Sequence, residues 1–317
     1  MQKFNYHSHT YRCGHADLDY TDEEYVLDYI KMGFKKMAFT DHCPEKNEID
    51  KRETMRMKYS EKCEYLDSIK KLKEKYKDKI EINSGFEVEY LPGEEENLNE
   101  LKKETDKLIL GQHFIYDDNK NLKIFGKEDF KEKELLRYAE YINNAMKLRI
   151  PDIVAHPDMF MLKRKEFGDI EKNVANLICK GAEEYNIPLE INLNDIFYKT
   201  YFENRKLNND PIEKQKEKLF KVSYPCKEFW NIATKYDIKV VYGIDAHFRG
   251  QILLWNNLLE LAHEILGDAI ISKLNFLEDD IWFNWILYIQ KSIKNNRVQI
   301  YTVIFIYTFL QKHLSFH

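Results

Sequence analysis

Apolar residues along the chain fall into seven short runs that are separated by amphipathic segments. The runs are rich in β-branched and aromatic residues, which is typical of strands, and the segments between them repeat apolar positions at helical spacing. The strand-like runs lie at 3–7, 36–42, 80–90, 107–114, 151–157, 187–194 and 237–247, and the helical segments at 21–34, 54–77, 128–148, 170–186, 226–236 and 252–266. This alternation predicts an α/β fold, a closed or nearly closed barrel of parallel strands, with an open doubly wound sheet as the alternative.

The first helix has the clearest boundaries. Thr21 followed by Glu24 fits a capping box at its start, and Gly33 fits the position just past its end. Because a strand-like run lies on each side, residues 3–42 show the pattern of a parallel β-α-β unit.

Histidine, aspartate and glutamate recur where the predicted strands end. In parallel β/α folds the carboxyl ends of the strands meet on one side, and active sites lie there. Seven of the ten histidines belong to this set when His15, in the loop after the first strand, is included. In strand order, the residues are His7 and His9, Asp41 and His42, Glu87, His113, His156, Glu190 with Asn192 and Asn194, and Asp245 with His247.

These residue types predict a metal site. Imidazole and carboxylate ligands together suit zinc, manganese and iron, and a set without cysteine argues against a purely structural zinc site. His7 and His9 lie two positions apart on an extended chain, so both side chains point to the same side and can bind one ion. The supply of ligands exceeds what one ion can use, which predicts two or three divalent ions. Such ions bring the pKa of bound water near neutrality, so we expect hydrolysis. His15 could bind substrate instead, and Glu190 is expected to support the structure or the ligands.

The charge, the glycine motifs and the cysteines of the sequence indicate which ligands and which cellular location to expect. The 49 basic and 54 acidic residues are mixed along the chain and give a net charge of -5, which leaves no broad basic field for nucleic acid. The sequence contains neither G-x-G-x-x-G nor G-x-x-x-x-G-K-[ST], the two glycine-rich phosphate loops. The five cysteines form no C-x-x-C pair and the N-terminus has no secretion-signal pattern, so we expect reduced thiols and a cytoplasmic location.

The sequence changes character from Ile281 onward, where it becomes aromatic and β-branched. Its two apolar runs are broken by KSIKNNRVQ, and each is shorter than the roughly 20 apolar residues that a membrane-spanning helix needs. We therefore expect no membrane span. The prediction divides the chain into a domain over 1–278 and an atypical C-terminal segment over 279–317, which would serve in docking or interaction. Frame-altered sequence and membrane contact are the alternatives for that segment.

The chain resembles the polymerase and histidinol phosphatase (PHP) superfamily of metal-dependent phosphoesterases, most of all its histidinol-phosphatase branch. The resemblance covers residues 1–278 and rests on seven motifs in order: HSHT, CGH, TDH, GFEVEY, GQHF, AHPDMF and GIDAHF. It implies a distorted TIM-like (β/α)7 barrel that holds three metals, commonly zinc, manganese or iron. By the family pattern, the first ion would be held by His7, His9, Glu87 and Asp245, the second by Glu87, His113 and His156, and the third by His15, His42 and His247.

The same resemblance implies hydrolysis of L-histidinol phosphate, a small phosphomonoester, to L-histidinol and phosphate in histidine biosynthesis. A hydroxide that bridges the metals would attack phosphorus, and the metals would neutralise the phosphate oxygens. Asp245 is expected to orient or deprotonate the nucleophile, with Glu87 and His15 beside it in the catalytic centre. Asp41 is expected to orient the neighbouring His42.

The chain departs from the family after the sixth predicted strand, where relatives carry a glycine and an arginine close to the asparagine. Here the stretch 195–224 is longer and lacks that glycine, and we expect it to form a lid over the site. The candidates for binding phosphate are Arg12, Lys163, Arg164, Lys199 and Arg205, although each of them also fits an ordinary solvated surface charge.

Two other functions stay open at this point. One is a related phosphoesterase that acts on nucleotides or oligonucleotide ends, which the acidic balance disfavours. The other is a metal-stabilised binding module without turnover, which the complete ligand set disfavours.

Overall fold

Eight parallel strands form the main sheet of the computed structural model, which describes residues 2–44, 55–203, 206–207 and 210–278. The strands lie side by side in the order in which they follow one another along the chain, and each is hydrogen-bonded to its neighbours. The strands are β1 (Phe4–Asn5), β2 (Lys36–His42), β3 (Glu81–Val88), β4 (Lys107–Leu110), β7 (Ile153–Val154), β8 (Leu189–Asn192), β11 (Lys239–Gly243) and β12 (Asn275–Phe276).

The chain just past the first strand, β1, also pairs with the chain just past β11, which is the next-to-last strand of the sheet. Ser8, just past β1, forms a parallel bridge with Ala246, just past β11. The backbone N–H of His9 donates to the carbonyl of Ala246 at 2.8 Å. The two-residue strand β12 pairs with β11 at Lys239 and Val240, the opposite end of that strand. The sheet therefore curls into an incomplete barrel whose carboxyl end is drawn together.

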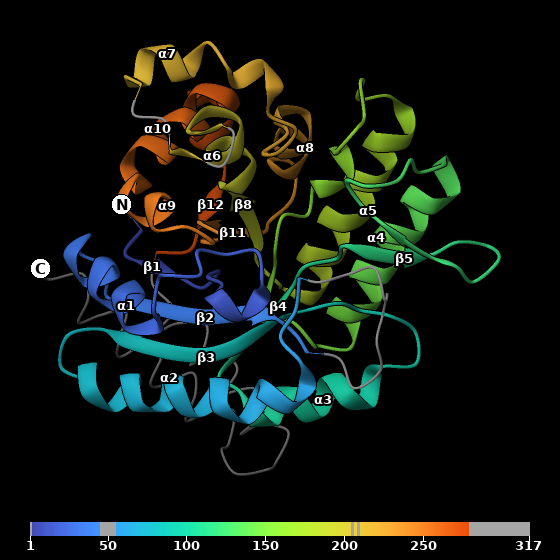
Figure 1. Cartoon of the computed structure of the whole chain (residues 1–317). Coiled ribbons are helices and arrows are strands. Elements are labelled where there is room, and N and C mark those ends of the chain that lie inside the picture. The colour runs from blue at the N-terminus through green and yellow to red at the C-terminus, as the bar shows by residue number, and fades with distance from the viewer. Residues whose placement is uncertain (1, 45–54, 204–205, 208–209, 279–317) are drawn as a thin grey trace, which may run out of the picture. The chain divides into compact units, whose positions relative to one another are not determined.

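Helices connect the strands and cover the outside of the sheet. In Figure 1, α2 runs along the β2–β3 part of the sheet, and α4 and α5 lie side by side. The helices are α1 (Asp22–Lys31), α2 (Lys62–Tyr76), α3 (Glu95–Glu104), α4 (Glu132–Lys147), α5 (Asp169–Tyr185), α6 (Asn194–Thr200), α7 (Ile212–Lys216), α8 (Lys227–Ala233), α9 (Arg249–Leu253), α10 (Trp255–Leu266) and α11 (Asp268–Ile271).

Local signals in the sequence account for the start of α1 and for the close packing of α4 on α5. The Thr21 hydroxyl accepts the N–H of Glu24, and the Glu24 carboxylate accepts the N–H of Thr21, which is the predicted capping box. On α5, Gly181 lies so near α4 that a Cβ there would be 1.7 Å from Asn143 Oδ1. The absence of a side chain at Gly181 thus lets the two helices approach.

The predicted α/β barrel is confirmed, and it carries one strand more than the seven expected from the sequence. The extra strand, β12, has only two residues and no alternating pattern that could reveal it. The fourth predicted strand ends at Leu110, and Phe114 begins a separate antiparallel hairpin of β5 (Phe114–Tyr116) and β6 (Leu122–Ile124). The helical pattern at 252–266 is divided between α9 and α10, which meet at Leu254.

The stretch 195–224 and the C-terminal segment were predicted to be a lid and a separate segment. Where it is described, the stretch 195–224 contains most of α6, the hairpin of β9 (Phe202–Glu203) and β10 (Lys206–Leu207), and α7. Its role as a lid is not tested by these elements. The segment 279–317 lies outside the described residues, so the division of the chain at residue 278 also stays a prediction. Within the described ranges, no helix is both long and apolar enough to cross a membrane.

Candidate metal centre

The histidines and carboxylates that end the strands converge on one site at the carboxyl end of the barrel. The structure brings together all nine residues that were predicted as ligands. Eight of them have buried side chains: His7, His9, His42, Glu87, His113, His156, Asp245 and His247. The ninth, His15, is partly exposed and lies in the loop after a short 3-10 helix, Tyr11–Cys13. Residues that are up to 240 positions apart in sequence are therefore neighbours in space.

Glu87, near the end of β3, occupies the centre of the site. Five imidazoles that follow four different strands face its carboxylate. Oε1 lies 2.8 Å from His156 Nε2, 3.5 Å from His7 Nε2 and 3.7 Å from His113 Nε2, and Oε2 lies 2.9 Å from His42 Nδ1 and 3.5 Å from His9 Nε2. One carboxylate can thus bridge ions that are held by different histidines.

Asp245 is the second carboxylate of the site. Its Oδ1 lies 3.0 Å from His9 Nε2 and 3.3 Å from His7 Nε2. Its Oδ2 accepts hydrogen bonds from the side-chain amides of Asn192 and Asn194, at 3.2 and 3.1 Å. The backbone of Asp245 has a φ of 51°, a left-handed conformation that is unusual for a residue other than glycine and that clusters at functional sites. The two amides therefore fix one oxygen and leave the other facing the histidines.

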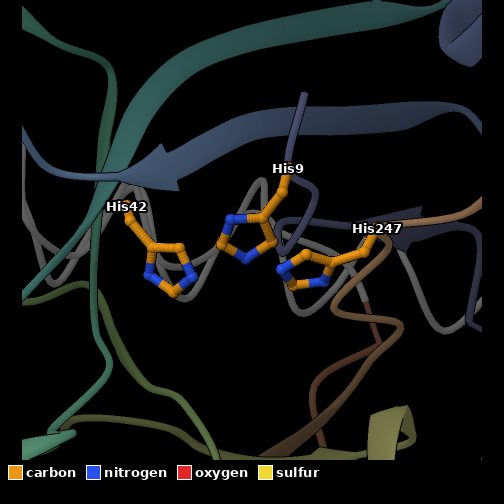
Figure 2. A group of neighbouring side chains, drawn as sticks. All are labelled: His9, His42 and His247. Carbon is orange, nitrogen blue, oxygen red and sulfur yellow. The ribbon is translucent and has the colours of Figure 1, made fainter. Parts of the chain in front are cut away.

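Three imidazole rings from distant parts of the chain lie together on one side of the site. Figure 2 shows the His9 ring between those of His42 and His247. The centroid of the His9 ring is 4.4 Å from that of His42 and 4.0 Å from that of His247. Rings this close would repel one another if all were protonated, so the arrangement favours neutral imidazoles that can bind a cation.

The donor atoms of the site fit divalent ions. In each of three groups, one donor atom per residue lies within 4.8 Å of the others: His7, His9 and Asp245; His7, Glu87 and His156; and His9, His42 and His247. Several of these buried atoms lie near other polar atoms of the cluster but make no hydrogen bond of good geometry with any described residue: Nε2 of His7 and of His247, both ring nitrogens of His9, Oε2 of Glu87 and Oδ1 of Asp245. A buried polar atom without a partner costs about 1–3 kcal/mol, and a bound ion would remove that cost.

The electrostatics of the cluster favour charged carboxylates. Burial by itself raises the pKa of Glu87 and of Asp245, but the surrounding histidines lower both far below the usual values. Burial by itself lowers the pKa of His7, whereas Asp245, Glu190 and Glu87 together raise it well above the usual value. His247 behaves in the opposite way, because burial and the nearby His9 lower its pKa to about 3. The site thus combines ionised carboxylates with imidazoles, as hard and borderline cations require.

Glu190, in β8, is hydrogen-bonded to two of the predicted ligands, His7 and His156. Its carboxylate oxygens lie 3.0 and 3.1 Å from His7 Nδ1, and Oε2 accepts the backbone N–H of His156 at 3.1 Å and the side-chain amide of Asn192 at 2.8 Å. The bond to Nδ1 leaves Nε2 of His7 as the atom that faces the site. Glu190 therefore fixes the orientation of one ligand and the backbone position of another.

We predict that Glu190→Gln weakens zinc binding by about 10–100-fold, the usual effect of losing a partner that orients a metal ligand. Glu190 accepts hydrogen bonds with both of its oxygens, whereas glutamine has a single carbonyl oxygen. The NH2 group of the glutamine would therefore face one of the donors that Glu190 now accepts. The measurement is competition with a chromophoric chelator, and Glu184→Gln, a change at an exposed position of α5, is the control. Equal affinities in the two variants would contradict this role of Glu190.

A further carboxylate, Glu89, holds His113 in the same manner. Glu89 Oε1 lies 2.7 Å from His113 Nδ1, and Oε2 accepts the backbone N–H of His113 at 2.8 Å. The Arg56 guanidinium donates to Oε1 at 3.3 Å and to the carbonyl of Cys43 at 3.2 Å. The sequence analysis missed both Glu89 and Arg56. The two-residue spacing of Glu87 and Glu89, which puts both on one side of an extended chain, was the available signal for Glu89.

Asp41 was expected to orient His42, but its carboxylate accepts hydrogen bonds from Thr10 instead. Its Oδ1 accepts the backbone N–H of Thr10 at 2.7 Å, and its Oδ2 accepts the Thr10 hydroxyl at 2.5 Å. His9 Nδ1 lies 3.9 Å from Asp41 Oδ1. The contact of Asp41 with Thr10 holds the turn that follows the two histidines of the first strand.

Two glycines leave room for the carboxylates. A Cβ on Gly111 would lie 1.8 Å from Glu87 Oε1, and a Cβ on Gly243 would lie 1.6 Å from Glu190 Oε1. No side chain can be accommodated at these distances unless the carboxylate moves. The positions of Glu87 and Glu190 therefore depend on the absence of a side chain at these two glycines.

The residues proposed to bind phosphate have protein partners in this structure. The Arg12 guanidinium donates to Asp22 at 2.9 and 3.0 Å and to Glu64 at 3.1 Å. Lys163 donates to the carbonyl of Lys127, Arg164 to the Glu171 carboxylate, and Lys199 Nζ lies 4.0 Å from Asp195 Oδ1. Arg205 lies outside the described residues. Phosphate binding by any of these side chains stays a prediction.

Comparison with known sequences connects this site to a family. The model of the PHP domain matches residues 5–194. The histidinol-phosphatase of Bacillus subtilis is 29% identical over 140 residues, which cover 42% of this chain and 52% of that protein, so the match spans about half of the relative's length. A candidate histidinol-phosphatase of Deinococcus radiodurans is 22% identical over 256 residues, 78% of this chain and 86% of that protein.

Solved structures share the fold of this chain. The crystal structure of a candidate histidinol phosphatase from Listeria monocytogenes matches with a TM-score of 0.60 and 23% identity, over 79% of this chain and 97% of the other. That of histidinol phosphate phosphatase from Lactococcus lactis, complexed with zinc, L-histidinol and phosphate, matches with a TM-score of 0.56 and 18% identity, over 82% and 94%. At such identities these structures show a shared fold. Since the family model covers more than half of the sequence, the chain belongs to the PHP domain family.

Proposed function

We propose that this protein is a metal-dependent phosphomonoesterase that hydrolyses L-histidinol phosphate to L-histidinol and phosphate. The observation that carries the proposal is the position of Glu87, whose two oxygens lie within 3.7 Å of nitrogens from five histidines. The relatives named histidinol-phosphatases and the zinc, L-histidinol and phosphate of the Lactococcus lactis structure support the choice of substrate.

Zinc, manganese or iron are the ions that these ligands suit. We propose the partition that the family resemblance implies: His7, His9, Glu87 and Asp245; Glu87, His113 and His156; and His15, His42 and His247. Three clusters of donor atoms support a division of this kind without reproducing its members: His7, His9 and Asp245; His7, Glu87 and His156; and His9, His42 and His247. Two or three divalent ions bound here would supply hydroxide near neutral pH and would neutralise the charge of the phosphate.

Among the side chains of this protein, Asp245 is our candidate for orienting the attacking water. Asn192 and Asn194 hold its Oδ2, so Oδ1 keeps a fixed direction toward His7 and His9. A water that donates a hydrogen bond to Oδ1 would have its lone pair turned away from the carboxylate, toward the substrate. Such fixed orientation accounts for a large part of catalysis in hydrolytic sites.

The test is the release of phosphate from L-histidinol phosphate by protein that has been loaded with zinc or manganese, compared with p-nitrophenyl phosphate and a short oligonucleotide. We expect kcat/KM to be highest for L-histidinol phosphate. Equal activity on the two monoesters would reject the proposed substrate. Degradation of the oligonucleotide at a higher rate would favour the alternative phosphoesterase function.

Removal of the ions is expected to destabilise the protein as well as to inactivate it. A free ion concentration of 100 times the dissociation constant adds about 2.7 kcal/mol to the free energy of unfolding, so a chelator should lower the thermal midpoint by about 4–5 °C for each ion removed. Differential scanning calorimetry before and after dialysis against a chelator, and again after zinc is restored, measures this. A midpoint that is the same in all three samples would argue against bound ions in the native protein.

The cytoplasmic location, the lid at 195–224 and the identity of the phosphate-binding side chain stay predictions. They rest on the sequence pattern alone.

A further inference from the structure

Cys13 is a buried thiol at the edge of the metal centre that the predicted ligand set does not contain. It ends the 3-10 helix Tyr11–Cys13, which begins where the Thr10 hydroxyl accepts the N–H of Arg12. Gly14 follows with a φ of 75°, a conformation that turns the chain back on itself. The turn puts the Cys13 side chain inside the protein, with none of its surface exposed.

The Cys13 sulfur lies among the histidines of the centre. It is within 4.8 Å of ring nitrogens of His15 and His247, which are also within 4.8 Å of each other. In a second cluster with the same limit, it lies near a ring nitrogen of His9 and a carboxylate oxygen of Asp41. Such spacing is what a single ion needs from its ligands.

The hydrogen bonds of the two nearest histidines are made at Nδ1. His15 Nδ1 lies 3.0 Å from the Cys13 carbonyl, and His247 Nδ1 lies 3.0 Å from the Asp245 carbonyl. A bond at Nδ1 fixes the tautomer whose Nε2 carries a lone pair. His247 Nε2 is buried and has no hydrogen-bond partner within the described part of the chain.

The backbone N–H groups of His15 and Ala16 are directed at the sulfur, whereas burial and the nearby Asp41 favour the neutral thiol while no cation is bound. A bound cation outweighs such burial, because a thiol that coordinates a metal is deprotonated outright. The two N–H groups would then stabilise the sulfur's negative charge.

We propose that the Cys13 sulfur is a ligand of the ion held by His15 and His247, which makes this position a mixed sulfur and nitrogen site. On binding, the S–H bond breaks, a sulfur–metal bond forms and the proton leaves to solvent. Thiolate prefers zinc to manganese, so this position would select zinc. The inference rests on the proposed metal centre, and it adds a ligand and a metal preference to it.

Cobalt(II) tests the inference, because a thiolate bound to cobalt gives a charge-transfer absorption in the near ultraviolet that nitrogen and oxygen ligands do not give. Metal-free protein would be titrated with cobalt while bound metal and absorbance are both recorded. Cys13→Ser is the test variant. Cys43→Ser is the matched control, since Cys43 is also buried and directly follows a histidine of the centre, but its thiol points to the Pro44 carbonyl at 3.7 Å.

We expect the band in the wild type and in Cys43→Ser, and its loss in Cys13→Ser together with an affinity for zinc that is about tenfold lower or weaker still. Cobalt that binds without the band in the wild type, or a band that persists in Cys13→Ser, would overturn the inference while leaving the proposed function intact. Failure to bind cobalt at all would count against the proposed function itself.

If Cys13→Ser does not fold, a variant in which Cys43, Cys63, Cys179 and Cys226 are replaced answers the same question. It keeps Cys13 as its single thiol. The band must then persist if the inference holds, and its loss from a folded, cobalt-binding protein would reject it.

Discussion

Glu87→Gln should reduce kcat/KM for phosphomonoester hydrolysis by about 10²–10³-fold, the range found when a group that stabilises charge at a reacting centre is removed. Glutamine keeps the size of the side chain but removes the negative charge that faces five histidines. It also replaces one oxygen by an NH2 group, which cannot bind an ion. The bound metal, measured by mass spectrometry with an inductively coupled plasma, should fall in the same variant.

Glu81→Gln is the matched control for this prediction. Glu81 begins the same strand, β3, but it is exposed and its carboxylate lies 3.8 Å from Lys36 Nζ, away from the cluster. It should retain both metal and activity. If Glu87→Gln kept its full metal content and turnover, the central position assigned to Glu87 would be wrong.

Gly111→Ala should have an effect as large as Glu87→Gln, although it adds a single methyl group and changes no charge. The new Cβ would lie 1.8 Å from Glu87 Oε1 and 2.4 Å from its carboxyl carbon. Glu87 would have to rotate out of the cluster, because the backbone N–H of Gly111 is fixed to the Val88 carbonyl at 3.1 Å. We expect loss of activity and of metal, with a decrease of about 1–3 kcal/mol in the free energy of unfolding from overpacking.

Gly168→Ala is the control for the glycine change. The nearest atom to a Cβ there is Glu171 Oε2 at 3.3 Å, so this carboxylate need shift by only a few tenths of an ångström. This variant should bind metal and turn over as the wild type does. Activity and metal content that survive in Gly111→Ala would show that the backbone there can yield, and that Glu87 does not depend on the close approach.

The position of the site could be predicted from the sequence because parallel strands present their carboxyl ends on one side. A histidine or carboxylate at each strand end must then face the same region, whatever the lengths of the connections. His263 illustrates the converse: it lies in α10, outside the set of strand-end histidines, and its Nε2 is 3.0 Å from the Tyr242 hydroxyl. Position at the end of a strand thus distinguishes the histidines of the site from a histidine elsewhere in the fold.

Residues that depend on loop geometry could not be predicted in this way. Cys13 reaches the centre because a 3-10 turn and a left-handed glycine bring the chain back, and Arg56 reaches Glu89 across 33 positions of sequence. The apolar run at 187–194 did not reveal that the chain enters α6 at Asn194. Neither a short turn nor a contact between distant segments leaves a periodic signal in the sequence.

The central claim is that these histidines and carboxylates hold divalent ions between them. Anomalous diffraction from zinc-soaked crystals, recorded on both sides of the zinc absorption edge, tests it most directly. We predict two or three peaks enclosed by the side chains of Glu87, Asp245 and their histidine neighbours, with zinc–nitrogen distances of about 2.0–2.1 Å. Peaks that occur only at surface residues, with none beside Glu87, would contradict the claim.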